Sequence, residues 1–468
     1  MGSTYARNLA VLGRVMHHRL PVRHVRVLAL LAFAVFLAAC SGTHHASHGS
    51  ATLRPAQFIV RPNISDPKCN GGRGVRLPAR PGGNPVLASA TVADGSTLIA
   101  ISDYSAKRSV VLHSVTRRCA PNAEFGRHGV ATIGISSRSP RTRPADSGAP
   151  SGLWLNAIAA RRGGGAILAG GFGGDWVIGE VSRRGQLDPT FGNGGWVVLP
   201  FQGEATTIVQ EPSGRIVIGG DNLGGGCCLV NSVAALSPRG QLQRAFGKRG
   251  RTVLRVPTGE AGIEALMLMP RGDILAAVGY GNNGCWGVAL AKLTSSGRPV
   301  SAFAQRTNRF WQRLGFSAFV GDTYSDAQGF TLIGTGQRPC SDGSLSSAPS
   351  ATGLMVHFRT DGQPIGSPVR FPSRMYGDVR AFHAGHETFV LVSPYADPTR
   401  LTLTARRRDG SIDPRFGSHG RARIHVPWSG RNSALDTMVS ITKARPSAIV
   451  VIATRYGRAQ LQVVRVRL

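Results

Sequence analysis

A twelve-residue string that returns along the chain limits its fold more than any other feature. It occurs at residues 186–197 and 411–422, with weaker copies around Phe125 and Phe246 and a degenerate copy around Phe303. The phenylalanines at 125, 191, 246, 303 and 416 are separated by 66, 55, 57 and 113 residues, and the last gap equals two periods. A period of about 57 residues is typical of the longer β-propeller blades. The repeat therefore predicts one array of similar units, where length alone would suggest two or three domains.

The repeated string has the composition of a tight turn. Its aspartate can accept hydrogen bonds from the backbone ahead, its proline fixes φ, and its glycines accept positive φ. We expect the phenylalanine to fill the space between neighbouring sheets, and we interpret Asp66, Asp188 and Asp413 as structural rather than catalytic because each precedes a proline in this turn. The residues assigned this structural role are Asp188, Pro189, Phe191, Gly192, Gly195, Phe246, Gly247, Asp413, Pro414, Phe416, Gly417 and Gly420.

Short apolar runs accompany each turn and predict an all-β fold. Seven of them follow a turn residue, at 97–101, 166–169, 215–219, 273–278, 330–334, 388–392 and 448–453. Each is flanked by two further apolar segments, and another follows the repeated turn, so that we expect four strands per unit. The content of 61 glycines and 28 prolines agrees with many short strands joined by turns.

The last unit lacks its fourth strand, because the chain ends at Leu468 inside the third. Residues 66–77 look like the repeated turn and the strand after it, placed ahead of the first unit. We expect this N-terminal strand to complete the last sheet and so leave no exposed sheet edge. The prediction is a seven-bladed β-propeller over residues 64–468, closed by its N-terminal strand.

The string Leu-Asp-Pro-x-Phe-Gly-x-x-Gly, with an upstream strand ending in glycine, resembles the delta-60 repeat, a bacterial relative of the NHL-type β-propeller repeats. The resemblance covers most of residues 66–468. The units near Phe303 and Pro364 depart from the pattern, which leaves the unit boundaries between 295 and 380 open. The resemblance implies an architecture and brings no catalytic residues.

The first forty residues have the layout of a secretion signal. They hold five arginines and no acidic residue, and an apolar run at 27–39 is shorter than the roughly 20 residues that a membrane-spanning helix needs. The run ends in Leu37, Ala38, Ala39 and Cys40, which resembles the lipobox of bacterial lipoproteins. We therefore expect residues 1–40 to be a lipoprotein signal peptide ending in a lipidated Cys40, and residues 41–63 to be a flexible tether. The expected location is the extracytoplasmic side of the cell membrane.

Six cysteines remain after Cys40, an even number in a compartment that permits disulfides. Cys69 lies in the closing turn and Cys119 in the corresponding turn of the first unit, so we predict a disulfide between them. The other four cysteines fall between the second and third strands of three consecutive units, where two further bridges or a zinc site are the open alternatives: Cys227, Cys228, Cys285 and Cys340. Because no paired C-x-x-C spacing is present, no metal is predicted.

Charge is the other unusual property. The formal net charge is +31, and removing the five arginines of the signal leaves 31 − 5 = +26, with only five lysines in the whole chain. Such a surface would attract a membrane, an anionic envelope glycan or lipid, or a protein partner. Export and the lack of a basic run interleaved with aromatics disfavour nucleic acid. A general compositional bias toward arginine is the alternative interpretation.

Aromatic residues recur after the second strand of the predicted units. They would form a ligand-binding rim if their loops converge, or would cap their own blades: Tyr104, Phe172, Trp176, Tyr280, Trp286, Tyr395 and Tyr456. No nucleophile elbow, HExxH motif or phosphate loop is visible in the sequence, and no catalytic residue or cofactor is predicted. The sequence favours a non-catalytic binding or scaffolding module at the cell envelope. A propeller enzyme, either a lyase or a cofactor-dependent dehydrogenase with a site at the channel mouth, is the alternative.

Overall fold

The computed structural model describes residues 68–69, 75–78, 85–103, 108–135, 152–224, 228–255, 260–282, 285–314, 317–326, 328–337, 352–372, 379–384, 387–392, 400–425, 437–444, 447–454 and 460–467. All of them belong to one compact unit, Arg61–Leu468. Cys40 and the expected signal peptide and tether lie outside the described residues. Among the described helices, none has the length and apolar character needed to cross a membrane.

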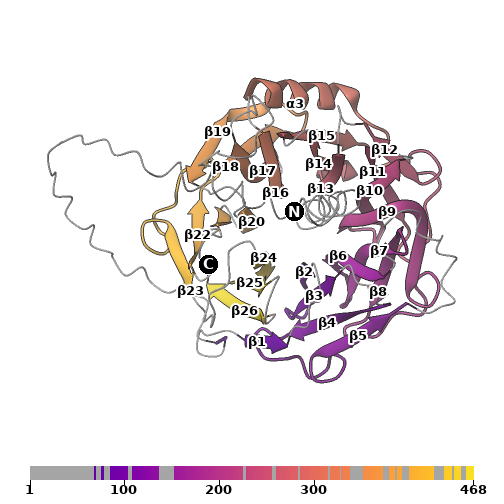
Figure 1. Ribbon diagram of the computed structural model, residues 1–468. Coiled ribbons are helices and arrows are strands. Elements are labelled where there is room, and N and C mark those ends of the chain that lie inside the picture. Colours follow the sequence, from indigo (N-terminus) through magenta and orange to yellow (C-terminus); the bar gives the residue numbers. More distant parts are fainter. Residues whose placement is uncertain are drawn as a thin grey trace, which may run out of the picture. The chain divides into compact units, whose positions relative to one another are not determined.

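The fold is all-β and is built from small antiparallel sheets (Figure 1). One sheet consists of β2 (Pro85–Thr91), β3 (Thr97–Asp103), β4 (Ser109–Val115) and β5 (Val130–Gly134). A second consists of β16 (Ser317–Asp326), β17 (Gly329–Gln337), β18 (Thr352–Arg359) and β19 (Pro364–Pro372). A third consists of β20 (Val379–Ala384), β21 (Glu387–Val392), β22 (Arg400–Arg406) and β23 (Arg421–His425).

The largest sheet has seven strands, because its central strand belongs to two units. In chain order the strands are β6 (Leu153–Ala160), β7 (Ala166–Phe172), β8 (Asp175–Val181), β9 (Trp196–Gln210), β10 (Ile216–Gly224), β11 (Cys228–Leu236) and β12 (Arg251–Leu254). The first part of β9 pairs with β8 and its last part pairs with β10. One continuous strand thus serves as the outer strand of one unit and the inner strand of the next.

The unit around Phe303 corrects the prediction of four strands per unit. Its described sheet has three strands, β13 (Glu260–Leu268), β14 (Ile274–Asn282) and β15 (Cys285–Leu293), with a short 3-10 helix η2 (Pro270–Gly272) between the first two. The helix α3 (Ser301–Leu314) lies in the chain where the fourth strand was expected and packs on β15. Buried Phe303, Thr307 and Trp311 recur every four residues, which is the spacing of one helical face and not the alternation of a strand.

The sheets follow one another around a closed circle in a β-propeller-like arrangement (Figure 1). The first strand of each unit lies against the first strand of the next, in the order β2, β6, β9, β13, β16, β20, β24 and back to β2. Apolar side chains fill the layers between neighbouring sheets; one layer combines Phe125, Leu155 and Trp196 from two units. The packing of sheet on sheet around a ring therefore provides the core.

The last sheet brings the two ends of the described chain together, as the sequence predicts. Its order is β1 (Val75–Pro78), β26 (Gln460–Arg467), β25 (Ser447–Thr454) and β24 (Thr437–Ala444). β1 runs antiparallel to β26, with Val75 opposite Val463 and Leu77 opposite Leu461. A strand from the start of the unit therefore supplies the outer strand of the sheet formed by its end.

Candidate functional site

The repeated turns are held in shape by their own side chains and by the strand before them. The Asp188 carboxylate accepts hydrogen bonds from the backbone N–H and the hydroxyl of Thr190, at 2.9 and 2.7 Å. These bonds lower the pKa of Asp188. The N–H of Asp188 donates to the Glu180 carbonyl, and the N–H of Asp413 donates likewise to Ala405. Asp188 and Asp413 thus fix the turn to the strand before it, and Asp66 lies outside the described residues.

Each turn also reaches the next unit through its phenylalanine. Phe191 is 1% exposed, and its ring lies against Gly240, where an added Cβ would be 3.0 Å from the ring. The same arrangement places Phe125 against Gly185 and Phe246 against Gly297. The glycine that follows each phenylalanine donates its N–H to the next unit, as in the 3.0 Å bond from Gly192 to the Arg239 carbonyl. Phe125, Phe191 and Phe246 therefore lie at the boundaries between neighbouring sheets.

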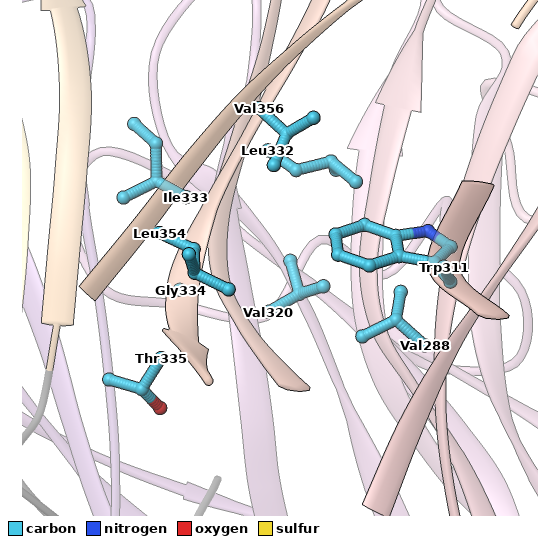
Figure 2. Close-up of a pocket in the computed structure, with 9 residues that line it drawn as sticks. All are labelled: Val288, Trp311, Val320, Leu332, Ile333, Gly334, Thr335, Leu354 and Val356. Carbon is cyan, nitrogen blue, oxygen red and sulfur yellow. The ribbon is translucent and has the colours of Figure 1, made fainter. Parts of the chain in front are cut away.

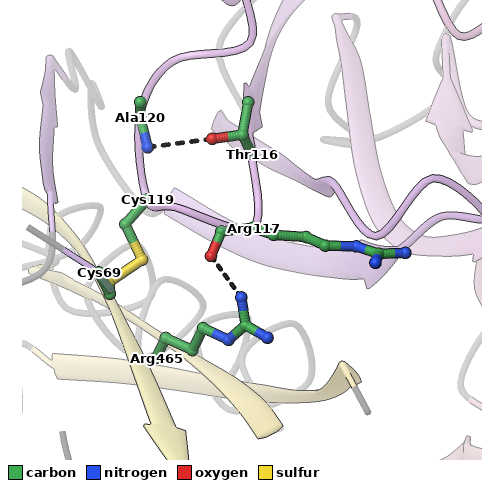
Figure 3. The surroundings of a disulfide bond; sticks show 6 residues. All are labelled: Cys69, Thr116, Arg117, Cys119, Ala120 and Arg465. Atoms are coloured by element: carbon green, nitrogen blue, oxygen red, sulfur yellow. Dashed lines mark hydrogen bonds between the residues drawn. A yellow bond between two sulfur atoms is a disulfide. The ribbon is translucent and has the colours of Figure 1, made fainter. Parts of the chain in front are cut away.

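A disulfide replaces this contact at the boundary between the last sheet and the first (Figure 3). Cys69 stands where the other turns have phenylalanine, and Cys119 stands where they have the receiving glycine. The two sulfurs are bonded, with the Cα atoms 4.8 Å apart, and both residues are buried. Cys119 has the positive φ of 58° that its position in the turn requires. The Arg465 guanidinium donates to the Arg117 carbonyl beside the bond.

Four basic side chains bridge neighbouring units at the same end of the strands. Arg161 donates to the Pro238 carbonyl at 2.8 Å and Arg215 to the Ser295 carbonyl at 2.7 Å. Lys292 reaches the Thr360 carbonyl at 3.2 Å, and Arg465 reaches Arg117. All four acceptors occupy the second position of the turn that follows the third strand of the next unit. After the turn that holds Ser295, the helix α3 takes the place of the fourth strand. Part of the arginine excess therefore serves to join the sheets.

Polar side chains at the inner strands form a second set of bridges. Three of them lie at β-bulges, where the residue has no partner in the strand ladder and its side chain faces the next unit: Asn156, Thr206 and Glu264. Asn156 Nδ2 donates to the Ala205 carbonyl at 2.9 Å, and Thr206 Oγ1 donates to Ile263 at 2.8 Å. No sequence pattern indicates these residues, because a bulge can be located only once the strand register is known.

The series continues with carboxylates that accept backbone N–H groups. Val320 donates to Glu264 Oε2 at 2.7 Å, and Ala381 donates to Asp322 Oδ2 at 2.8 Å. Burial raises the pKa of Glu264, while the N–H of Val320 and the charge of Arg380 act in the opposite direction. Arg380 donates in turn to the Gly321 carbonyl at 3.1 Å. These acids hold one inner strand to the next.

A buried polar cluster lies between β6 and the β9–β12 part of the large sheet. Trp154 Nε1 and Asn156 Nδ2 donate to Glu204 Oε2, at 2.5 and 3.2 Å. The Glu204 N–H donates to Asp221 Oδ1 at 3.1 Å, and Trp176 Nε1 donates to the Asp221 carbonyl at 2.7 Å. Glu204 and Asp221 are at most 1% exposed. Because neither carboxylate reaches solvent, this cluster joins sheets and is not open to a substrate.

The most enzyme-like group of side chains lies between the β16–β19 and β20–β23 sheets. The Tyr324 and His383 rings are stacked with centroids 4.5 Å apart, and the Tyr324 hydroxyl lies 2.7 Å from Thr388 Oγ1. His357 Nδ1 lies 2.7 Å from the Thr331 hydroxyl. Burial raises the pKa of Tyr324 and lowers that of His357. A phenol and an imidazole are suitable groups for general acid–base chemistry.

The aromatic residues predicted to form a rim divide into three groups. Phe172 and Trp176 are 3% and 0% exposed in the layers between sheets, which corrects their assignment to a binding loop. The loop between them is only Gly173 and Gly174, both with positive φ, so their strands continue to the hairpin. Tyr280 is partly buried against the β9–β12 layer. Trp286 lies in β15, with no described side-chain environment, and Tyr104, Tyr395 and Tyr456 lie outside the described residues.

For the four remaining cysteines, two further disulfides and a zinc site stay the predicted alternatives. Cys228 begins β11 and Cys285 begins β15, at the same end of neighbouring sheets. Cys227 and Cys340 lie outside the described residues. Among the described residues, no group of three or more His, Cys, Asp or Glu is placed to hold a metal ion.

A small cavity lies between the β13–β15 and β16–β19 sheets (Figure 2). Its lining is almost entirely apolar and includes Val288, Trp311, Val320, Leu354 and Val356. The volume of about 10 Å³ is at the lower limit for one water molecule, and the lining offers few polar partners. We interpret it as a packing gap and not as a ligand site.

Comparisons with known proteins give structural matches at low sequence identity and no sequence match. No protein family model and no curated protein matches the sequence. Among solved structures, the polysaccharide lyase Uly1 matches with a TM-score of 0.49 and 10% identity, over 82% of this chain and 89% of that one. The WD40 domain of Toxoplasma gondii coronin matches with a TM-score of 0.43 and 12% identity, over 82% and 81%. Trypanosoma rangeli sialidase in complex with sialic acid matches with a TM-score of 0.38 and 9% identity, over 82% and 54%.

Proposed function

We propose that this chain is an exported, lipid-anchored binding or scaffolding module, built as a seven-bladed β-propeller of the delta-60, NHL-like kind. The blade count follows if the seven-stranded sheet is divided at β9, because each half then has one inner strand in the ring. β1 completes the last blade by pairing with β26. Helix α3 takes the outer place in one blade.

The observation that carries a non-catalytic role is the use of the inner polar side chains. Asn156, Thr206, Glu264 and Asp322 each hydrogen-bond the backbone of the next unit. A catalytic site needs reactive groups that are held in place yet remain available to a substrate. Groups engaged in joining sheets instead make a rigid ring, which is suited to presenting loops to a partner.

Export is supported by the Cys69–Cys119 bond, because buried disulfides form and persist in oxidising compartments. The anchor is tested by detergent phase partitioning of the full-length protein and its Cys40→Ala variant in a bacterial host. The wild-type chain should enter the detergent phase, and the variant should remain uncleaved or be released to the aqueous phase. Equal partitioning of the two proteins would refute lipidation at Cys40.

An enzyme is the second candidate, favoured by the stacked Tyr324 and His383. A lyase would need a base to remove a proton and an acid to protonate the leaving group, which these two side chains can supply. The test compares turnover of acidic polysaccharides by the wild-type chain with turnover by Tyr324→Phe and His383→Gln. Turnover that both variants abolish at unchanged thermal stability would establish the enzyme. No turnover by wild type, together with retention of an envelope component, supports the scaffold.

A further inference from the structure

One face of the ring carries exposed arginines that have no partner among the described residues. We define the basic face by six residues of the turns around the third and fourth strands: Arg118, Arg127, Arg183, Arg184, Arg239 and Arg249. All six are exposed. None takes part in an ion pair with a described acidic residue. Their charges therefore remain available to an external anion.

Hydrogen bonds between turns make these residues neighbours. Gly126, next to Arg127, donates its N–H to the Arg184 carbonyl at 2.9 Å. Gly192 donates to the Arg239 carbonyl at 3.0 Å. The turns of three consecutive units thus adjoin, although their arginines are more than 50 residues apart in the sequence. The arginines of the basic face therefore lie on adjoining turns.

In the corresponding turn of the β20–β23 sheet, the arginines are paired with acidic residues. Arg407 lies 3.6 Å from Asp413, and Arg408 lies 2.8 Å from Asp326. Arg415 is paired with Asp413 and Glu387. The arginines of this turn are therefore neutralised within the fold. A general bias toward arginine does not explain why the arginines of the basic face have no acidic partner.

The chain enters the propeller at this same face. Cys69 is bonded to Cys119, the residue after Arg118, so that Lys68 and Cys69 lie beside the basic face. Cys40 precedes Lys68 by 28 residues. The tether that the sequence predicts would have a root-mean-square span of about 30 Å at that length. An acyl group on Cys40 would therefore hold the basic face close to the bilayer from which it extends.

We infer that the basic face binds the anionic headgroups of the lipid bilayer that holds the anchor. This inference rests on the proposed lipid-anchored function and names the surface that meets the membrane. Arginine guanidinium groups pair well with phosphate oxygens, and basic clusters beside a lipid anchor strengthen membrane attachment by attraction to acidic lipids. The ring would then lie with its turn face toward the membrane and the opposite loops toward the exterior.

The test uses the mature chain from residue 41 onward without acyl groups, which contains every described residue. Co-sedimentation is measured with vesicles of phosphatidylcholine alone and of phosphatidylcholine with 30% phosphatidylglycerol, at low, intermediate and high salt. We expect binding to the acidic vesicles only, and its loss as salt rises. The variant Arg183→Glu/Arg184→Glu/Arg239→Glu should bind at least about tenfold more weakly.

The matched control is Arg309→Glu/Arg313→Glu/Arg423→Glu, which makes the same charge change at exposed positions on α3 and β23, the outer elements of two other units. It should keep most of the binding. Equal losses in the two variants would show attraction by net charge alone and overturn the proposed face. Binding to a soluble acidic polysaccharide without binding to acidic vesicles would also overturn it. Because no acyl group is present, either failure leaves the anchoring test at Cys40 unaffected.

Discussion

Cys69 and Cys119 are bonded at the boundary where the ring closes, in the positions that phenylalanine and glycine occupy at other boundaries. Four other boundaries have an aromatic ring packed over a glycine, as with Phe191 and Gly240. The sheet on one side of the closing boundary is assembled from both ends of the fold, because β1 pairs with β26 in it. The disulfide ties the turn that precedes β1 to the first sheet.

Replacing the disulfide by a phenylalanine–glycine pair tests whether Cys69 and Cys119 occupy the positions of that pair. Cys69→Ser/Cys119→Ser should lower the free energy of unfolding by about 4 kcal/mol, since the bond closes a loop with a sequence separation of 50 residues. Cys69→Phe/Cys119→Gly should recover part of this loss, because the ring refills the space and glycine suits the φ of 58°. Denaturant unfolding with and without reductant measures both. A phenylalanine–glycine variant no more stable than the serine variant would contradict the correspondence.

The contact between Phe191 and Gly240 can be tested from either side. Phe191→Ala should cost about 3–5 kcal/mol of unfolding free energy. Gly240→Ala should also destabilise, because the new Cβ would lie 2.7 Å from Val197 Cγ2 and 3.0 Å from the Phe191 ring. The double variant should lose less than the sum of the two, since removal of the ring relieves one of these contacts.

Gly194→Ala is the control for backbone conformation in that cycle. Gly194 has a φ of 61° and no atom within 4 Å of an added Cβ. The variant should lose only the cost of a left-handed alanine, about 1–2 kcal/mol. Gly240→Ala losing no more than Gly194→Ala, or strict additivity with Phe191→Ala, would mean that the close contact has no energetic role.

Removal of one inner bridge should weaken the ring. Thr206→Val keeps the side-chain volume but removes the 2.8 Å hydrogen bond to the Ile263 carbonyl. We expect a loss of about 0.5–1.5 kcal/mol, because a part-buried hydrogen bond between two inner strands is removed. Thr190→Val removes an exposed hydroxyl bonded to Asp188 at 2.7 Å and should cost less. Equal losses in the two variants, measured by denaturant unfolding, would argue against a special role for the inner position.

Glu180 should make stability depend on pH. Burial raises its pKa from 4.5 to about 7, although the Arg161 guanidinium 2.5 Å away acts to lower it. A carboxyl whose pKa is higher in the folded state stabilises below pH 4.5, and this contribution is lost as pH rises toward 7. The stability of the wild-type chain relative to Glu180→Gln should therefore fall across pH 4.5–7, by no more than about 3 kcal/mol.

Arg161→Met provides the second arm of this experiment. Without the opposing cation the pKa of Glu180 should rise further, and the pH window should move upward. Unfolding midpoints of the three proteins across pH 4–8 measure both effects. A difference between wild type and Glu180→Gln that does not change with pH would contradict the assignment.

The parts of the fold that the sequence predicts are those formed by short segments that recur along the chain. The predicted second-strand runs all fall largely within observed strands, and Val75 pairs with Val463 as expected from the missing last strand. Four of the five phenylalanines of the repeat are buried, and Phe416 is partly buried against the last sheet. These features depend on short segments whose residue types fix their conformation.

The features that the sequence does not predict depend on strand register, or on two residue patterns that indicate different structures for the same segment. The spacing of Phe303, Thr307 and Trp311 was readable as a helical face, but a degenerate copy of the turn at Phe303 favoured a strand. The sequence pattern predicts a loop around Phe172 and Trp176, because adjacent glycines do not reveal that the hairpin turn is only two residues long. The bridges from Asn156 and Thr206 depend on bulges set by pairing with distant strands. Sequence could not place them.

Hydrogen exchange in residues 460–467 tests whether β1 closes the ring. β26 pairs with β25 on one side and with β1 on the other. Deleting residues 66–79 should speed amide exchange in this segment and promote aggregation through the exposed edge. Deleting residues 41–54 should change neither, and Cys69→Ser/Cys119→Ser separates loss of the disulfide from loss of the strand. A monomeric deletion variant with unchanged protection of residues 460–467 would contradict the closed ring.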